Sequence, residues 1–391
     1  MPSNVVSALR PTAVNSVLAQ VKALQAQGRN IVSLMRGEPD FPTPSHIVNA
    51  ATEALAKGRT TYPDNRGELK FREAVATKLH RDNKLSYDPA TEILITTGAT
   101  QGLYCALTAL LNPGDEVLLP NPVYDAYQSP IRLTGSIPKP VNSVVTAGRF
   151  TIPFESLEAA ITPASKVLLL NSPWNPAGTV FTIAELSAIG DFVLRHNLTL
   201  ISDEIYEAIT YDGCQHISPA SLSPELRANT VIVNSLSKTY AMTGWRSGYC
   251  AAPKPIIDAM FLILQQSSRG PAMFVQDASA AALSGPQDCV AQMQSEYAKR
   301  RALVLEQLSG IPGVIPLAPE GGFFVMADTQ GLNEPSDKTR QRLLENHGVV
   351  VIHGSAYGSQ GEGTLRVSFS SGAVLPAGLE RLRTGLLEPR Q

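Results

Sequence analysis

The chain has 391 residues, of which 43% are apolar and 17% are charged, and its formal net charge is -2. This length allows two or three domains with a substantial hydrophobic core, and the near-neutral charge indicates no binding surface for nucleic acid or an anionic membrane. The four cysteines lie far apart and no apolar stretch reaches membrane-spanning length, so a disulfide framework, a zinc site and a membrane anchor are not expected. A cytoplasmic location follows by default.

The first predicted elements are two helices separated by a proline-rich crossing. One helix is predicted over residues 12–28 and the other over Ser45–Lys57, and each ends at a glycine. Between them, the prolines in Gly37-Glu38-Pro39-Asp40-Phe41-Pro42 favour extended chain.

The middle of the chain alternates short apolar runs with helical patterns. Helices are predicted over 99–111 and 183–196, and strands over 93–96, 116–119, 166–170, 198–202, 231–234 and 248–251. Such alternation predicts an α/β fold, with a mostly parallel sheet covered by helices on both faces.

The pattern changes after about residue 282. A long charged helix runs through Tyr297, and strands are predicted over 321–325 and 364–369, which indicates a smaller α+β domain. The N-terminal helix should pack with it, because an isolated helix of that length cannot bury its own apolar face. We therefore predict an N-terminal segment over 1–45, a large domain over 46–284 and a small C-terminal domain over 285–391.

Polar residues follow four of the predicted strands at the point where each strand ends. The segments are Gly98–Thr100, Asn171–Gly178, Asp203–Tyr206 and Ser235–Lys238. Because ligands of open α/β sheets bind beyond the carboxyl ends of the strands, these segments predict the functional site.

The segment Ser235-Leu236-Ser237-Lys238, followed eight residues later by Arg246, resembles the cofactor-lysine motif of class I/II aminotransferases. Further family-like motifs follow the family order: G-E-P-D-F at 37–41, N-x-P-x-N-P-x-G at 171–178, S-D-E-I-Y at 202–206 and L-R-V-S-F at 365–369. The resemblance implies a pyridoxal 5'-phosphate (PLP) enzyme of fold type I. Such an enzyme has a large domain with a mostly parallel seven-stranded sheet and a smaller α+β domain. It is usually a homodimer with its sites at the subunit interface.

The resemblance assigns four residues to the aldehyde, the ring nitrogen and the phenolic oxygen of the cofactor. Lys238 would form an imine with the PLP aldehyde and, once released, move a proton between the substrate α-carbon and the cofactor's C4′. Asp203 would keep the pyridine nitrogen protonated, while Asn175 and Tyr206 would hydrogen-bond the phenolic oxygen. From the residues alone, Lys238 could be a surface lysine, Asp203 a helix N-cap, Asn175 a turn residue and Tyr206 a packing tyrosine.

A phosphate needs fixed donors and positive charge. Ala99 and Thr100 lie at a predicted helix N-terminus, and Ser235, Ser237 and Arg246 add hydroxyl and guanidinium donors. Thr100 could instead be a simple cap and Arg246 a surface ion pair.

The remaining predicted contacts are with the ring, the partner subunit and the substrate. Tyr124 matches the family's aromatic residue that stacks on the cofactor ring, and Tyr62 matches the tyrosine that reaches the partner subunit's phosphate. Arg366 matches the clamp on the substrate α-carboxylate, helped by the Gly37 backbone and by Asn175. The alternatives are packing roles for both tyrosines, an internal salt bridge for Arg366 and a turn for Gly37.

These residues predict transamination between an L-amino acid and a 2-oxo acid such as pyruvate or 2-oxoglutarate. The resemblance includes aspartate aminotransferases, but Thr100 stands where one bacterial subgroup of them carries a lysine that contacts acidic substrates. The stretch from His216 to Lys238 is similar to arginine–pyruvate transaminases. Arg269 also departs from the family pattern and is either a substrate or partner contact or a surface charge.

Two other functions stay open at this point. A PLP-dependent lyase, synthase or oxidase could use the same lysine, aspartate and arginine. A regulator with an aminotransferase-like sensor domain would need a DNA-binding module ahead of the motif at residue 37, where we expect no room for one.

Overall fold

The structure is a computed structural model that describes residue 6, residue 9 and residues 11–388. The outermost parts of the predicted N-terminal segment and C-terminal domain lie outside these described residues. Within the described ranges, no helix combines the length and the apolar character needed to cross a bilayer.

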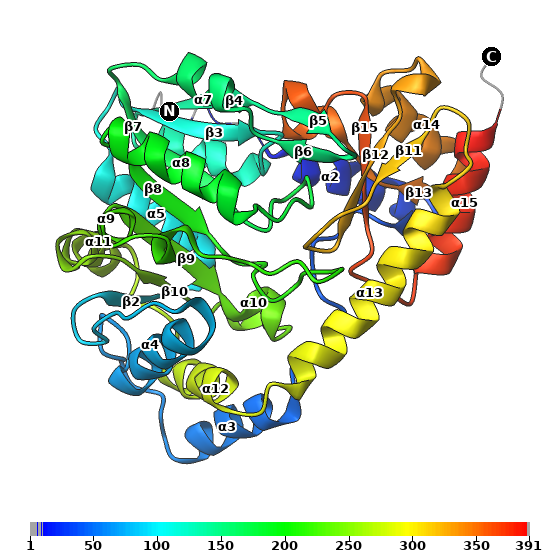
Figure 1. The fold of residues 1–391 in the computed structure, drawn as a ribbon. Coiled ribbons are helices and arrows are strands. Elements are labelled where there is room, and N and C mark those ends of the chain that lie inside the picture. The colour runs from blue at the N-terminus through cyan, green and yellow to red at the C-terminus, as the bar shows by residue number, and fades with distance from the viewer. Residues whose placement is uncertain (1–5, 7–8, 10, 389–391) are drawn as a thin grey trace.

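A seven-stranded sheet forms the centre of the larger part of the molecule (Figure 1). Its order is β2-β10-β9-β8-β7-β3-β4, and all neighbours are parallel except β10, which is antiparallel to both β2 and β9. This confirms the predicted mostly parallel sheet. The strands are β2 (Ile93–Thr96), β3 (Glu116–Asn121), β4 (Ile137–Asn142), β7 (Ser165–Asn171), β8 (Thr199–Asp203), β9 (Thr230–Ser235) and β10 (Gly248–Ala251).

Helices cover both faces of this sheet because the strands are apolar on both faces. On β9, Val231 and Val233 pack with α5 (Gly98–Leu110) and α11 (Lys254–Ser267). Ile232 points the other way, toward α4 (Leu69–Asn83) and α12 (Met273–Ser284). α8 (Ile183–Arg195) packs on that second face near β7. The alternation follows from the two-residue repeat of a strand.

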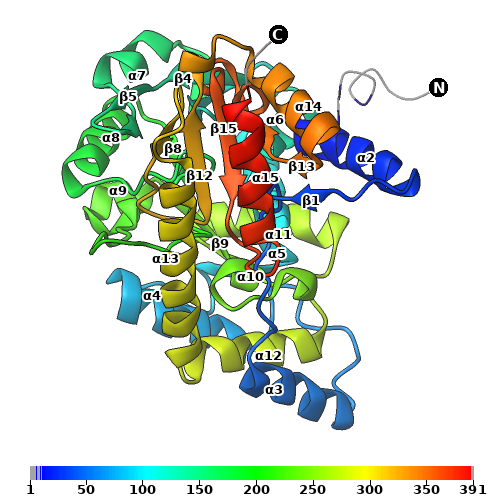
Figure 2. The ribbon, with the colours of Figure 1, turned by 90° about the vertical axis from the view of Figure 1, so that its right-hand side faces the viewer.

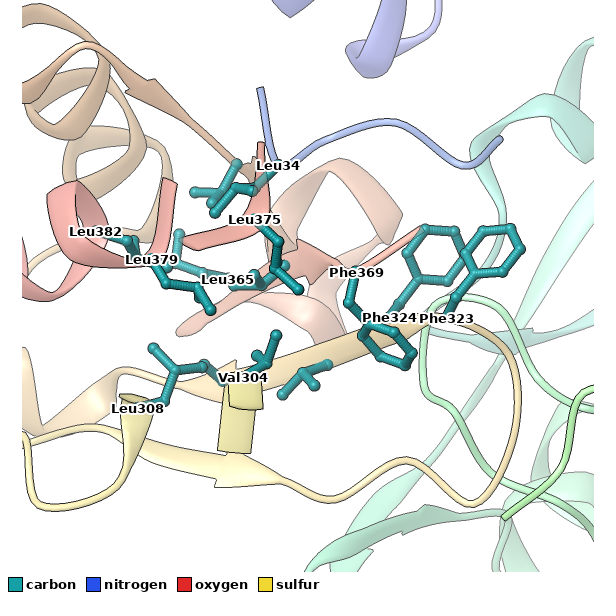
Figure 3. Close-up of a cluster of buried hydrophobic side chains, with 14 of the residues drawn as sticks. Leu34, Val304, Leu308, Phe323, Phe324, Leu365, Phe369, Leu375, Leu379 and Leu382 are labelled. Carbon is teal, nitrogen blue, oxygen red and sulfur yellow. The ribbon is translucent and has the colours of Figure 1, made fainter. Parts of the chain in front are cut away.

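The smaller part contains an antiparallel sheet of order β11-β12-β15-β14. Its strands are β11 (Ile315–Leu317), β12 (Phe324–Asp328), β14 (Ile352–His353) and β15 (Thr364–Ser368), and helices α13 (Asp288–Leu308), α14 (Ser336–His347) and α15 (Leu375–Leu387) pack with it. Figure 3 shows the core between them, where Val304 and Leu308 of α13 face Leu365 and the α15 leucines. Phe323, Phe324 and Phe369 close the end of this core nearest the large sheet.

The N-terminal elements contact the smaller part before the chain crosses to the larger one. Val17 and Val21 of α2 (Ala13–Ala26) are buried with Leu344 of α14, and β1 (Val32–Ser33) pairs in parallel with β13 (Val349–Val350). Figure 2 shows α2 and β1 beside α14 and β13. The next helix, α3 (Ser45–Ala56), packs against α12 instead. The domain boundaries after residues 45 and 284 stay predictions.

Among the differences between the structure and the sequence-based expectation, two concern strands of the main sheets. The strand predicted to start at residue 321 begins at Phe324, because Gly321 forms an isolated bridge with Thr210 and the chain bends at Gly322, which has a φ of +73°. Strand β4 was not predicted, because Pro138 and Pro140 interrupt its apolar pattern; at the sheet edge such a strand tolerates proline. The remaining elements are α6 (Gln128–Leu133), α7 (Phe154–Ala160), α9 (Pro224–Ala228), α10 (Leu236–Thr239), β5 (Val144–Thr146) and β6 (Arg149–Thr151).

Candidate active site

A cavity of about 660 Å³ lies at the carboxyl ends of the parallel strands, between the two sheets. Strand β10 runs in the opposite direction, so the residues just before it, including Arg246, reach the same edge. The predicted site residues that line the cavity are Gly37, Ala99, Thr100, Tyr124, Asn175, Asp203, Tyr206, Ser235, Ser237, Lys238, Arg246 and Arg366.

Lys238 is carried by α10, the short helix that follows β9. Its Nζ donates a hydrogen bond to the Gly37 carbonyl at 2.5 Å and lies 5.8 Å from the centre of the Phe323 ring. Burial lowers the pKa of Lys238 from 10.5 to about 8, opposed by Glu38 and assisted by Arg246 and Arg366. The neutral amine, which a nucleophilic lysine requires, is therefore more abundant near neutral pH than it would be at the ordinary pKa.

Asp203 is the last residue of β8 and is only 4% exposed. Tyr127 Oη donates to its Oδ2 at 2.6 Å, and the Ile205 N–H donates to its Oδ1 at 3.2 Å. Burial raises the pKa of Asp203 to about 6, although both of these hydrogen bonds act in the opposite direction. The carboxyl group is thus fixed in orientation and lacks a cationic hydrogen-bond partner among the described residues.

Arg366 lies in β15 and is 3% exposed. Its Nη1 donates to Asn175 Oδ1 at 3.2 Å and its Nη2 donates to the Met35 carbonyl at 2.9 Å. The rings of Phe324 and Tyr357 lie 4.0 Å and 5.0 Å from its Cζ. Its Nε has no hydrogen-bond partner, and no carboxylate within residues 11–388 forms an ion pair with it. A buried guanidinium surrounded by neutral groups is a binding site for an anion.

A second anion site is built around the start of α5. The first N–H groups of this helix, including those of Ala99 and Thr100, have no acceptors within the helix. Arg246 reaches the same point, because a Cβ added to Gly98 would lie 2.8 Å from Arg246 Nη2. Ser235 Oγ lies 2.7 Å from Ser237 Oγ and 3.0 Å from the Ser247 carbonyl, so its hydroxyl already has internal partners.

Two aromatic side chains complete the cavity wall. Tyr124 is 36% exposed, and its ring packs edge-on against Tyr127 with centroids 5.3 Å apart. Tyr206 is buried against Phe323 and Phe324, with centroid distances of 5.4 Å and 6.2 Å, and burial raises the pKa of its hydroxyl above the ordinary value.

Tyr62 is the one predicted site residue that does not line this cavity. It is 78% exposed in the single chain, and the Arg269 guanidinium lies 4.4 Å from the centre of its ring. Tyr62 and Arg269 therefore form one exposed pair, and the sequence alone did not indicate this contact.

Three groups that hold the site together received no role in the sequence analysis. Tyr127 orients Asp203, and its signal was its position three residues after Tyr124. Asn171 donates to the Asp203 carbonyl at 2.9 Å and accepts from the Asn175 N–H at 2.7 Å, and it opens the N-x-P-x-N-P-x-G motif. Met35 acts through its backbone carbonyl, for which the sequence carries no signal.

These groups fit PLP. A lysine with a lowered pKa and a buried carboxyl group line the same cavity as two separate anion sites, one of which leaves a guanidinium nitrogen without a partner. PLP carries an aldehyde, a ring nitrogen and a phosphate, and its substrates carry a carboxylate.

Comparison with known proteins identifies the family. The family model described as aminotransferase class I and II matches residues 29–382. The chain is 38% identical to aspartate aminotransferase of Geobacillus stearothermophilus over 96% of both chains. It is also 38% identical to the aspartate/prephenate aminotransferase of Cereibacter sphaeroides over 91% of both chains. The crystal structure of aspartate aminotransferase from Rhizobium meliloti superposes with a TM-score of 0.95 at 35% identity, covering 99% of this chain and 98% of the other. The chain therefore belongs to the class I and II aminotransferases, PLP-dependent enzymes of fold type I.

Proposed function

We propose that this enzyme transfers an amino group from an L-amino acid to a 2-oxo acid, with Lys238 as the residue that binds PLP covalently. The observation that carries this proposal is the cavity itself. It combines a lysine whose pKa is lowered to about 8, a buried aspartate and an arginine without an acidic partner among the described residues.

When bound, PLP supplies an electrophilic aldehyde carbon and a pyridinium ring that stabilises negative charge at the substrate α-carbon. Lys238 would hold the cofactor covalently through its neutral amine and, when free, would move a proton between the substrate α-carbon and C4′. Asp203, oriented by Tyr127, would hold the proton on the ring nitrogen. Asn175 and Tyr206 would donate hydrogen bonds to the phenolic oxygen.

The outer groups would fix the two ends of the complex. The start of α5, Ser237 and Arg246 would bind the phosphate, while Tyr124 would stack on the ring. Arg366 would bind the α-carboxylate in its fixed donor fork, and Gly37 would contribute its backbone. Because Arg366 would hold the carboxylate in place, the bond from the α-carbon to hydrogen would break rather than the bond to the carboxylate. This favours transamination over decarboxylation.

We further propose that the enzyme is a homodimer in which Tyr62 contacts the partner's phosphate site. Tyr62 is largely exposed in the single chain, and Arg269 supports its ring. A cytoplasmic location stays a prediction.

A donor screen tests the function. The PLP-loaded enzyme is mixed with a panel of L-amino acids, without an acceptor, and both the cofactor's visible absorbance and the released 2-oxo acid are measured. We expect at least one donor to yield one equivalent of pyridoxamine phosphate and one of 2-oxo acid. Continuous release of ammonia and a 2-oxo acid without an acceptor would contradict transamination and favour a lyase or an oxidase.

A further inference from the structure

A buried ion pair lines a second cavity together with Leu236 and Thr239 of α10, whereas Lys238 of the same helix lines the candidate active site. It joins Lys78 of α4 to Glu207, and the two side chains are only 7% and 10% exposed. Asn83 completes the group, because its Nδ2 donates to Glu207 Oε2 at 3.0 Å and its Oδ1 accepts from Lys78 Nζ at 2.8 Å. Burial alone would raise the pKa of Glu207, but Lys78, His216 and Asn83 hold it below the ordinary value, so the carboxylate is ionised.

This ion pair is connected to the segment that carries Lys238. Asn234 Nδ2 donates to Glu207 Oε1 at 2.7 Å, and Asn234 Oδ1 accepts from the Ser235 N–H at 2.7 Å. Ser235 is the N-cap of α10, where its Oγ accepts from the Ser237 N–H at 3.1 Å. A continuous chain of polar contacts therefore leads from Lys78 to the first turn of the helix on which Lys238 sits.

The same pair is also tied to the segment that carries Asp203 and Tyr206. Glu207 follows Tyr206 directly, and its N–H donates to the Glu204 carbonyl at 3.0 Å. The Glu204 N–H in turn donates to the Val233 carbonyl on β9 at 2.9 Å. Glu207 thus holds together the two strand ends that deliver Asp203 and Lys238 to the cavity.

A metal ion is not the best explanation of this cluster. Ligand atoms of Glu204, Glu207 and His216 lie within 4.8 Å of one another, which is close enough for a cation. However, the Ser202 and Ser218 hydroxyls donate to Glu204 Oε1 at 2.9 Å and 2.7 Å, and the Lys78 ammonium already neutralises Glu207. A cation would have to displace these donors and lie beside a fixed positive charge.

A buried ion pair is weak evidence for stability, since the cost of removing two charges from water often equals their attraction. Its geometric effect is stronger, because Glu207 Oε1 accepts from both Lys78 of α4 and Asn234 of β9, while Glu207 Oε2 accepts from Asn83 of α4. We propose that Lys78 and Glu207 are positioning residues that set the location of Lys238 relative to Asp203, and thereby the affinity for PLP. This inference rests on the proposed function, in which Lys238 binds the cofactor.

The test compares three variants of Lys78 and Glu207 by equilibrium titration of the apoenzyme with PLP. For Lys78→Met we expect the dissociation constant for PLP to rise about tenfold or more, equivalent to about 1.4 kcal/mol. We also expect the pH midpoint of the visible absorbance of lysine-bound PLP to move. Lys78→Arg keeps the charge and should stay within about twofold of the natural enzyme. The guanidinium has room, because Lys78, Asn83 and Glu207 line a second cavity of about 470 Å³.

The double variant Lys78→Met with Glu207→Met covers the case in which the single variant does not fold. It leaves no unpaired buried charge, yet it also removes the connection to Asn234, so PLP affinity should fall as in Lys78→Met. The matched control is Glu334→Gln, which breaks the ion pair of Arg342 and Glu334 (3.0 Å, side chains 20% and 22% exposed) in the small sheet region. This control should leave both PLP affinity and the absorbance midpoint unchanged.

A folded Lys78→Met or double variant with natural PLP affinity and an unmoved absorbance midpoint would overturn the positioning role while leaving the proposed function intact. A natural enzyme that fails to bind PLP would instead overturn the proposed function on which this inference depends. Restoration of PLP binding in Lys78→Met by Mg²⁺ or Zn²⁺ would also overturn the positioning role, since the cluster would then be a cation site.

Discussion

Lys238, Asp203 and Arg366 are ionisable side chains that are buried in the cavity. Burying such groups without an oppositely charged partner is unfavourable when no ligand is bound. The pKa of Lys238 is lowered to about 8 and the pKa of Asp203 is raised to about 6, and in both cases burial is the largest cause. Arg366 lacks an acidic partner among the described residues. pKa shifts of this size within one cavity are typical of functional sites, where a bound ligand supplies the oppositely charged partner of each group.

The lowered pKa of Lys238 predicts how the apoenzyme captures PLP. Only the neutral amine attacks the aldehyde, and the neutral fraction increases as the pH rises through the pKa. The rate of capture, followed by stopped-flow absorbance, should therefore increase with pH and reach half of its maximum near the pKa of about 8. A rate that keeps rising with a midpoint near 10.5, the ordinary lysine value, would contradict the burial argument.

Arg366→Lys tests the assignment of the carboxylate clamp. Lysine keeps the positive charge but lacks the planar fork, so one charge-assisted hydrogen bond of about 1.5–3 kcal/mol should be lost. We expect kcat/KM for the amino donor to fall roughly 10- to 100-fold, with little change in PLP affinity. The comparison variant is Arg342→Lys, whose arginine pairs with Glu334 away from the cavity. Equal kinetics for Arg366→Lys and the natural enzyme would remove Arg366 from the site.

Strand ends are the elements that assemble this site. Asn171 of β7 and Asp203 of β8 are register partners, and the antiparallel β10 brings Arg246 to the same edge as Ser235 of β9. Between β3 and β4, a short helical stretch at Asp125–Tyr127 delivers Tyr127 to Asp203. The sheet therefore sets the spacing of groups that lie far apart in the sequence.

Tyr127→Phe tests this delivery. The Tyr127 hydroxyl opposes the rise in the pKa of Asp203, so its removal should raise that pKa further above about 6. A lost hydrogen bond to a charged group is worth about 1.5–3 kcal/mol, or roughly one to two pH units. Because the ionised carboxylate binds the protonated ring nitrogen, PLP affinity measured against pH should be lost at a correspondingly higher pH. Tyr357→Phe is the control, since the buried Tyr357 hydroxyl has no hydrogen-bond partner among the described residues. If the pH at which PLP affinity is lost is the same in Tyr127→Phe as in the natural enzyme, the role of this hydroxyl is contradicted.

Elements were predictable where local pattern and tertiary context agree. The strands at 93–96 and 248–251 have the predicted bounds, because each is a short apolar run closed by polar or turn residues. Helix α4 was not predicted, because Arg72 and Lys78 are both 6% exposed and face the interior where apolar residues are expected. Lys78, one of the charged residues that obscured the helical pattern of α4, is also the residue that we propose positions Lys238.

The site could be predicted further than the fold details because its chemistry is local to sequence motifs. Asn175, Asp203, Ser235 and Lys238 belong to motifs at the ends of β7, β8 and β9, whose common edge follows from parallel pairing, while Arg366 and Gly37 come from motifs outside the large sheet. Groups that act through the backbone, such as Met35, or through a distant helix, such as Lys78, carry no motif. They become visible only when the whole chain is folded.

The whole molecule is proposed to work as a dimer in which each subunit contributes Tyr62 to the other site. This predicts complementation between two defective enzymes, Lys238→Ala and Tyr62→Ala. A mixed dimer would contain one site with both natural residues and one site with neither. After co-refolding, activity should exceed the sum of the two separate variants, as measured by 2-oxo acid release. Activity equal to that sum in a proven mixed dimer would mean that Tyr62 acts within its own subunit or not at all.

The central claim is that Lys238 is the residue that binds PLP covalently, and chemical trapping tests it most directly. The enzyme is incubated with PLP, reduced with borohydride, digested and analysed by peptide mass spectrometry. The account predicts one phosphopyridoxyl group per chain, located on Lys238, and its absence when the enzyme is first converted by an amino donor to the pyridoxamine form. A stable adduct on another lysine, or no adduct in folded enzyme, would contradict it.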